Sequence, residues 1–197
     1  MNAIDVTLDQ DIAGKLFDRA YFQGLRARVW AALHRRPSRL LDLNELSAGW
    51  TIHSRHFAGS RSVPIKQIRG SENRADDFDA AFHPLDADDK DRWRRVAEAW
   101  MRRHNLPPIE LIHAGDIYFV RDGHHRISVA AALGEQEIDA VVTEWEVEDV
   151  RTAAQRGTGH EPGGRAAPAS SASGSLGSIR DRLAAGGTPL PAGEQCA

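Results

Sequence analysis

The sequence predicts an α+β fold: a small mixed sheet with packed helices, a helical extension before it and a disordered tail after it. Between residues 60 and 146, short apolar runs of strand-forming residues alternate with segments of helical period. Residues 1–48 are mainly of helical period. Residues 150–197 are rich in Gly, Ala, Pro and Ser, and so little apolar bulk cannot offset the entropy of ordering a backbone. We therefore expect three parts, with boundaries at these positions.

Composition excludes several classes of protein. The 197 residues suit one ordinary domain with extensions, and the net charge of -3 provides no general attraction to nucleic acid or to an anionic membrane. A single cysteine, Cys196, cannot form an internal disulfide. The amino terminus is acidic where a signal peptide is basic, and no apolar run approaches the roughly 20 residues of a spanning helix. We expect a cytoplasmic protein that does not enter membranes.

The segment from Asp9 to Arg36 predicts a helix that Gly24 divides or bends and Pro37 ends. Five basic residues gather near its end: Arg26, Arg28, Arg35, Arg36 and Arg39. They could contact DNA, but a solvated basic face is favoured because few aromatic residues are interleaved for stacking on bases. A short second element is expected at residues 40–46.

Residues 49–62 fit no regular element clearly. His53 and His56 have a spacing that can hold a metal, yet zinc sites normally need three or four ligands and no cysteine is near. We expect ordinary polar loop histidines here and no metal site. A first strand is predicted at residues 63–69, followed by a loop that contains Glu72 and Arg74.

Acidic residues crowd the segment 76–91, where their oxygens could form a magnesium site, but an acidic loop and helix amino terminus are favoured. The apolar residues of the helix that follows share one face: Trp93, Val96, Ala97, Trp100 and Met101. Next come a strand from Ile109, a turn at Gly115-Asp116, a strand over residues 117–120 and a charged loop. A helix from about His124 should end at Gly134, and a strand returns at residues 138–142.

The charged loop from Asp122 to Arg126 predicts an anion site. A strand that turns into a helix through a glycine exposes unpaired N–H groups at the positive end of the helix dipole. Asp122 is placed to cap the helix, Gly123 permits close approach of a ligand, and Arg126 offers a forked pair of donors for phosphate. His124 and His125 can donate, accept or transfer protons. The alternative is that Asp122 only caps and the histidines form a polar first turn.

The string Asp122-Gly123-His124-His125-Arg126, with its following helix and strand, resembles the nucleotide-phosphate loop of the ParB/sulfiredoxin superfamily. The opening strand of that family is similar to residues 63–68, and the resemblance extends to Trp145. It implies a ParB/sulfiredoxin-like fold for residues 60–146. The loop is also similar to that of ParB-like free-serine kinases, which have an Asp-Gly-His-x-Arg loop and a catalytic glutamate soon after the first strand.

The resemblance implies a bound nucleotide. ParB proteins hold the phosphates of CTP, and sulfiredoxins those of ATP, which implies that Gly123, His124, His125 and Arg126 bind phosphate here. Arg74 is the candidate for a family arginine that meets the ligand after the first strand. Sulfiredoxins have a nucleophilic cysteine in this loop, and this chain has none there. Nothing after residue 145 resembles the DNA-binding or dimerisation regions of ParB.

The sequence thus favours a protein that binds ATP or CTP, with Mg²⁺. If it is an enzyme, phosphoryl transfer or triphosphate hydrolysis is the natural reaction, with Glu72 as general base or magnesium partner and Asp122 assisting the metal. The alternative function is a non-catalytic ParB-like regulator that binds DNA or a protein partner. A third is a domain that keeps the fold and has lost its ligand. The sequence does not predict an oligomeric state.

Overall fold

The computed structural model describes residues 3–149, and the disorder expected for residues 150–197 lies outside that range. The helices and strands follow one another in this order: α1 (Ala3–Leu33), β1 (Leu41–Asp42), α2 (Leu43–Ser47), β2 (Trp50–Pro64), the 3-10 turn η1 (Ile65–Gln67), β3 (Ile68–Ser71), α3 (Lys90–Met101), β4 (Ile109–Ala114), β5 (Ile117–Asp122), α4 (His124–Ala132) and β6 (Glu137–Asp149). The expected α+β class is confirmed.

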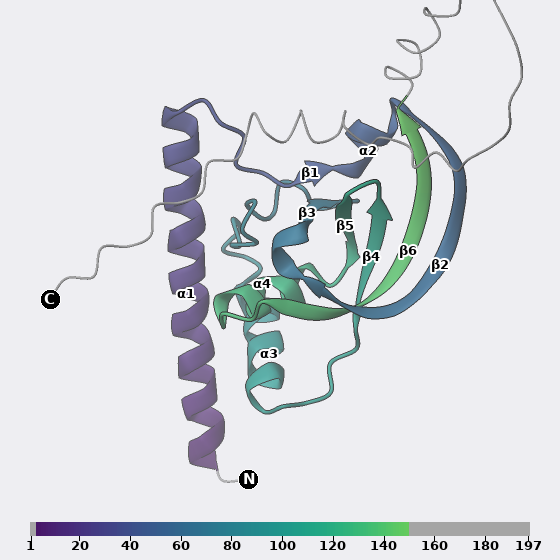
Figure 1. The fold of residues 1–197 in the computed structure, drawn as a ribbon. Coiled ribbons are helices and arrows are strands. Elements are labelled where there is room, and N and C mark those ends of the chain that lie inside the picture. The colour runs from purple at the N-terminus through teal and green to yellow at the C-terminus, as the bar shows by residue number, and fades with distance from the viewer. Residues whose placement is uncertain (1–2, 150–197) are drawn as a thin grey trace, which may run out of the picture.

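All the strands join one mixed sheet in the order β1-β3-β5-β4-β6-β2 (Figure 1). The pairs β1–β3, β3–β5 and β4–β6 are parallel, whereas β4–β5 and β2–β6 are antiparallel. Because β3 and β5 run in parallel, their carboxyl ends meet at one edge of the sheet. That edge carries the segments that lead out to α3 and into α4.

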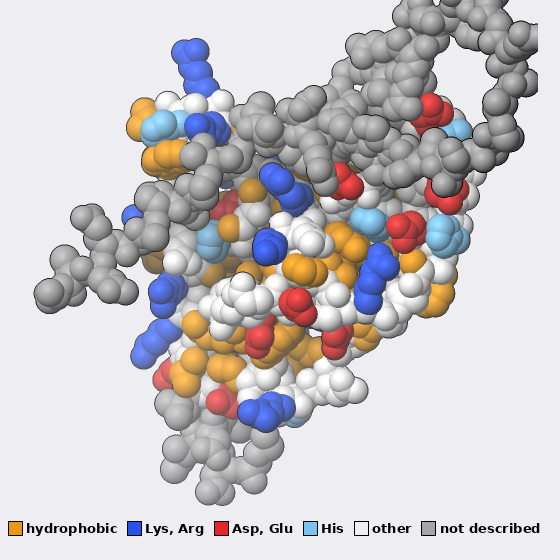
Figure 2. Space-filling view, viewed as in Figure 1, with side chains coloured by type: hydrophobic (Ala, Val, Ile, Leu, Met, Phe, Trp, Pro, Cys, Tyr) orange, Lys and Arg blue, Asp and Glu red, His pale blue; other side chains and the backbone are white. Residues whose placement is uncertain are grey.

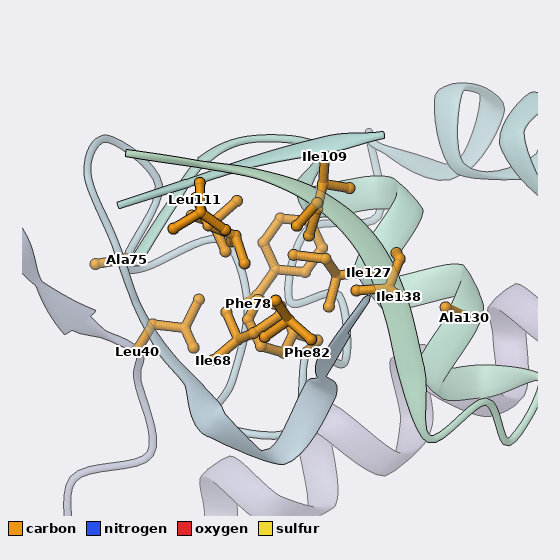
Figure 3. Close-up of a cluster of buried hydrophobic side chains, with 14 residues drawn as sticks. Leu40, Ile68, Ala75, Phe78, Phe82, Ile109, Leu111, Ile127, Ala130 and Ile138 are labelled. Carbon is orange, nitrogen blue, oxygen red and sulfur yellow. The ribbon is translucent and has the colours of Figure 1, made fainter. Parts of the chain in front are cut away.

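The sheet buries apolar side chains on both faces, because successive residues of a strand point to opposite sides. In β4, Leu111 packs into a cluster with Phe78 and Ile127 of α4, as Figure 3 shows. Its neighbour Ile112 packs on the other face, in a cluster that includes Leu43 of α2. Full burial of one such side chain stabilises the fold by about 1.5–3 kcal/mol. The two clusters therefore place α4 on one face of the sheet and α2 on the other.

The amino-terminal helix α1 is continuous through Gly24, so of the division or bend expected there, the division is wrong. A Cβ at Gly24 would lie 3.0 Å from both the Cβ of His83 and the carbonyl oxygen of Pro84. The absence of a side chain at Gly24 therefore lets α1 pack closely against the loop that contains His83 and Pro84. Phe17 of α1 meets Trp93 of α3 edge to face at 5.6 Å between ring centroids. Asp18 of α1 pairs with Lys90, the first residue of α3, at 2.6 Å.

Residues 50–64 form the long strand β2, which corrects the expected loop at His53 and His56. The strand pairs with β6 from Trp50 opposite Asp149 to Pro64 opposite Glu137. Two register shifts interrupt it, and Gly59 near the second has a φ of 86°. His53 pairs with Glu148 on β6 at 3.3 Å. Bulges break the alternation of side chains, which explains why the sequence shows no clear strand pattern.

The remaining elements are close to expectation, with shifted limits. The first strand expected at residues 63–69 is divided among the end of β2, η1 and β3, and β6 is longer than the expected 138–142. The β4–β5 hairpin turns at Gly115 with a φ of 65°, and Gly134 follows α4 with a φ of 84°, as predicted. No helix within residues 3–149 is long and apolar enough to cross a membrane.

Candidate functional site

A pocket of about 260 Å³ lies where the ends of β3 and β5 meet the amino ends of α3 and α4. Six of the residues singled out in the sequence line it: Arg74, Asp122, Gly123, His124, His125 and Arg126. Glu72 is not in the lining. Its carboxylate lies 3.3 Å from the Nε of Arg121, and Arg121 does line the pocket. The structure therefore gathers residues from three separate segments around one hollow.

Gly123 is the N-cap residue of α4, and Asp122 does not cap the helix as expected. The glycine has a φ of 105° and a ψ of 18°, and within residues 3–149 no capping side chain accepts a hydrogen bond from the first turn. Asp122 instead accepts a hydrogen bond from Nη2 of Arg126 at 2.7 Å. The first N–H groups of α4, at the positive end of its dipole, therefore have no side-chain cap.

The ring of His124 is buried and held in one orientation. Its Nε2 lies 2.8 Å from the Oγ of Ser71, the last residue of β3. That oxygen accepts hydrogen bonds from the backbone N–H groups of Arg74 at 2.8 Å and Asn73 at 3.3 Å. With both lone pairs used, the hydroxyl donates its own proton to Nε2, so the ring carries its proton on Nδ1.

Both histidines are kept neutral at pH 7. Burial, and then the charge of Arg74, lowers the pKa of His124 to about 4. Burial also lowers the pKa of His125, although the nearby carboxylate of Asp89 opposes the shift. The Nε2 of His125 lies 3.2 Å from an oxygen of Asp89 but outside hydrogen-bonding geometry. This nitrogen belongs to a side chain only 5% exposed and has no hydrogen-bond partner within residues 3–149.

The arginines of the pocket differ in how firmly they are held. Arg74 binds Asp77 at 2.5 Å and Asp89 at 3.0 Å, and its guanidinium lies 5.7 Å from the ring centroid of Phe78. Arg92 is exposed on α3 and has no carboxylate partner in the described part of the chain. Four arginines and one carboxylate line the pocket. Three of these arginines pair with carboxylates, namely Arg74, Arg121 and Arg126, so Arg92 is the lining cation that no carboxylate within residues 3–149 neutralises.

The role expected for Arg126 needs revision. Its Nη1 donates to the carbonyl oxygens of Pro107 and Pro108, the latter at 2.8 Å, and its Nη2 donates to Asp122. The forked donors predicted for phosphate are thus engaged within the protein, and they hold the segment before β4 against α4. The side chain contributes its charge to the pocket and fixes the position of the loop.

Four residues of the site were not predicted from the sequence: Ser71, Asp89, Arg92 and Arg121. Arg121 had a usable signal, because it lies two residues before Gly123 at the end of a predicted strand. Ser71 similarly ends the strand that precedes Glu72. Asp89 and Arg92 had no such signal in the sequence, because their role depends on how the amino end of α3 docks beside α4.

Comparisons with known proteins add little to this geometry. No model of a known protein family matches the chain, and neither does any curated protein. Among solved structures, the chain is similar to sulfiredoxin from Arabidopsis thaliana, with 18% sequence identity and a TM-score of 0.33. The matched region covers 42% of this chain and 82% of the sulfiredoxin chain.

Proposed function

We propose that the pocket at the amino end of α4 binds the phosphate groups of a nucleotide, ATP or CTP. The observation that carries this proposal is the lining itself: four arginines against the single carboxylate of Asp122, at a helix terminus without a side-chain cap. Phosphate oxygens need positive charge and N–H donors, and a helix amino terminus supplies both. The buried, unpartnered Nε2 of His125 is a further group that a ligand oxygen could satisfy.

The size of the pocket suits phosphates better than a whole nucleotide. Its volume of about 260 Å³ falls below the roughly 300–1,000 Å³ of pockets that enclose small molecules. Gly123 forms part of the wall, and its lack of a side chain makes room for Ile109, which an added Cβ would meet at 2.5 Å. We therefore expect the phosphates to be enclosed and the ribose and base to lie outside the pocket.

Magnesium would enter with the nucleotide in this proposal. Within residues 3–149 no group of three or more His, Cys, Asp or Glu side chains is arranged to hold a metal ion. Mg²⁺ commonly binds through one or two carboxylates together with substrate phosphates, and Asp122 is the carboxylate available in the lining. The ion would neutralise charge that develops on the phosphates.

The proposed reaction is phosphoryl transfer or triphosphate hydrolysis, in which positioning and electrostatic stabilisation supply most of the catalysis. Arg74, Arg92 and Arg121 would stabilise the phosphoryl group, and the neutral His124 would donate from Nδ1. Glu72, held beside Arg121, would accept the proton of the attacking hydroxyl or water. This role for Glu72 and the choice between ATP and CTP rest on the resemblance of the Asp122 to Arg126 loop.

Replacing Arg92 by glutamine is expected to weaken nucleotide binding by about 10- to 100-fold, because a charge-assisted hydrogen bond contributes roughly 1.5–3 kcal/mol. The side chain is exposed and forms no ion pair in the described part of the chain, so the fold should be unaffected. Isothermal titration with ATP, ADP, CTP and GTP, each with and without Mg²⁺, measures the change in Kd.

The matched control is Arg95→Gln, which removes an exposed arginine from the same helix but outside the pocket. Equal effects of the two variants, or no binding of any nucleotide by the native protein, would contradict the proposal. Arg126→Ala is a poor test. It would leave the carbonyls of Pro107 and Pro108 without their donor, so lost binding could reflect a displaced loop.

A further inference from the structure

The carboxyl half of α1 exposes a row of large apolar side chains. The exposed fractions are 61% for Phe22, 44% for Leu25, 63% for Val29 and 79% for Leu33. We call these four residues the α1 stripe. Scattered apolar residues are normal at a protein surface, but a contiguous row on one helix indicates a contact. At the upper left of Figure 2, where α1 ends, hydrophobic side chains lie at the surface beside basic ones.

The stripe faces away from the body of the protein. Ala20, Gly24 and Ala31 are the buried residues of this half of the helix. At 3.6 residues per turn, Val29 points about 160° away from Ala31, so the stripe and the packed face lie on opposite sides. A helix that is apolar on both sides is normally covered on both. Within residues 3–149, only the inner side of α1 is covered.

The spacing of the stripe residues and the charges beside them indicate what kind of binding partner fits the stripe. Phe22, Leu25 and Val29 follow the three-four spacing of a coiled-coil seam, in which flanking charges select the partner. Here both flanks are basic: Arg26 and Arg28 are exposed and have no ion-pair partner within the described residues. Residues 19–41 contain six arginines and no Asp or Glu, in a chain whose net charge is -3.

We propose that the α1 stripe docks one amphipathic helix of a partner protein, with an apolar seam flanked by Asp and Glu. A second copy of this chain fits poorly. Antiparallel pairing that places Leu25 opposite Val29 also brings Arg26 beside Arg26 of the other copy and Arg28 beside Arg28, and these like charges repel. The four side chains span an arc of about 80°, and Trp30, which is 51% exposed, extends the exposed apolar surface of this half of α1 to about 140°.

The test uses the full chain and two labelled synthetic helical peptides with leucine at every seam position. One peptide has glutamate at the flanking positions, and the other has lysine. Fluorescence anisotropy should show binding of the glutamate peptide and at least tenfold weaker binding of the lysine peptide. Val29→Gln should reduce glutamate-peptide binding at least tenfold. The double variant Arg26→Glu, Arg28→Glu should reverse the preference, whereas Arg95→Glu on α3 should leave it unchanged.

Several outcomes would overturn the proposal. Failure of the glutamate peptide to bind the folded protein would do so, as would equal binding of both peptides. Dimerisation in sedimentation experiments that Val29→Gln abolishes would assign the stripe to a second copy. Binding to phosphatidylserine vesicles or duplex DNA that depends on Val29, without peptide binding, would assign it to a membrane or to nucleic acid. The inference does not depend on the pocket. The Arg92→Gln variant should therefore bind the glutamate peptide with the affinity of the native chain.

Discussion

Replacing Gly123 by alanine is expected to lower the free energy of unfolding by about 3 kcal/mol. Two costs combine at this position. A φ of 105° is strained for any residue with a Cβ, and an added Cβ would lie 2.5 Å from Cγ2 and 2.8 Å from Cβ of Ile109. Ile109 is only 1% exposed on β4 and has little freedom to move. Urea denaturation followed by tryptophan fluorescence measures the loss.

Gly134→Ala provides the matched control for backbone strain alone. Gly134 also has a positive φ, 84°, but a Cβ there would meet nothing within 4 Å. We expect its substitution to cost about 1 kcal/mol, the strain of a single left-handed residue. Similar losses for the two variants would mean that contact with Ile109 does not constrain the turn from β5 into α4.

Stability is expected to fall by about 3 kcal/mol as the pH is lowered from 6.5 to 4, through His124 alone. The unfolded chain takes up a proton on this ring below its ordinary pKa of 6.5, whereas the folded protein resists until about 4. The full contribution is therefore present above pH 6.5, declines as the pH falls, and is lost below about 4. His125, whose pKa is also lowered, adds to the decline in the same direction.

Urea denaturation at a series of pH values, for the native chain and for His124→Gln, measures this dependence. The free energy of unfolding of His124→Gln should fall less steeply with decreasing pH than that of the native chain. The variant His104→Gln, at an exposed position, should show the native pH dependence. If the free energy of unfolding of His124→Gln depends on pH as steeply as that of the native chain, burial of a neutral His124 is excluded as the cause of the decline.

A bound phosphate should raise the pKa of His124, because a nearby anion favours the charged ring. Inorganic phosphate should then make the decline in stability smaller, because the pKa values of His124 in the folded and unfolded chains lie closer together.

Much of the site could be predicted because its central part is local in sequence. The change from strand to helix at Gly123, the end of α4 at Gly134 and the turn at Gly115 depend on glycines that adopt positive φ. Their positions could be inferred from residue type and from the periodicity of neighbouring residues. The α+β class followed in the same way, since each short element carries its own pattern.

The remaining features depend on packing between distant segments. Asp122 is a good helix cap by type, yet Arg126 one turn later competes successfully for its carboxylate. Asp89 joins Arg74 to His125 only because α3 docks with its amino end at the pocket. Gly24 has the composition of a helix break, and only contact with the loop at His83 shows that it serves close packing.

The pairing of β2 with β6 also sets the order in which the sheet can assemble. Strand β2 lies at one edge and pairs only with β6 among the described residues. Synthesis of the 85 residues from Pro64 to Asp149 takes roughly 4–17 s at about 5–20 residues per second. For that time β2 lacks its complete partner strand, and an unpaired apolar strand would invite aggregation. The frequent Ser, His and Arg of β2, which obscure it as a strand in the sequence, should limit aggregation of the nascent chain during this interval.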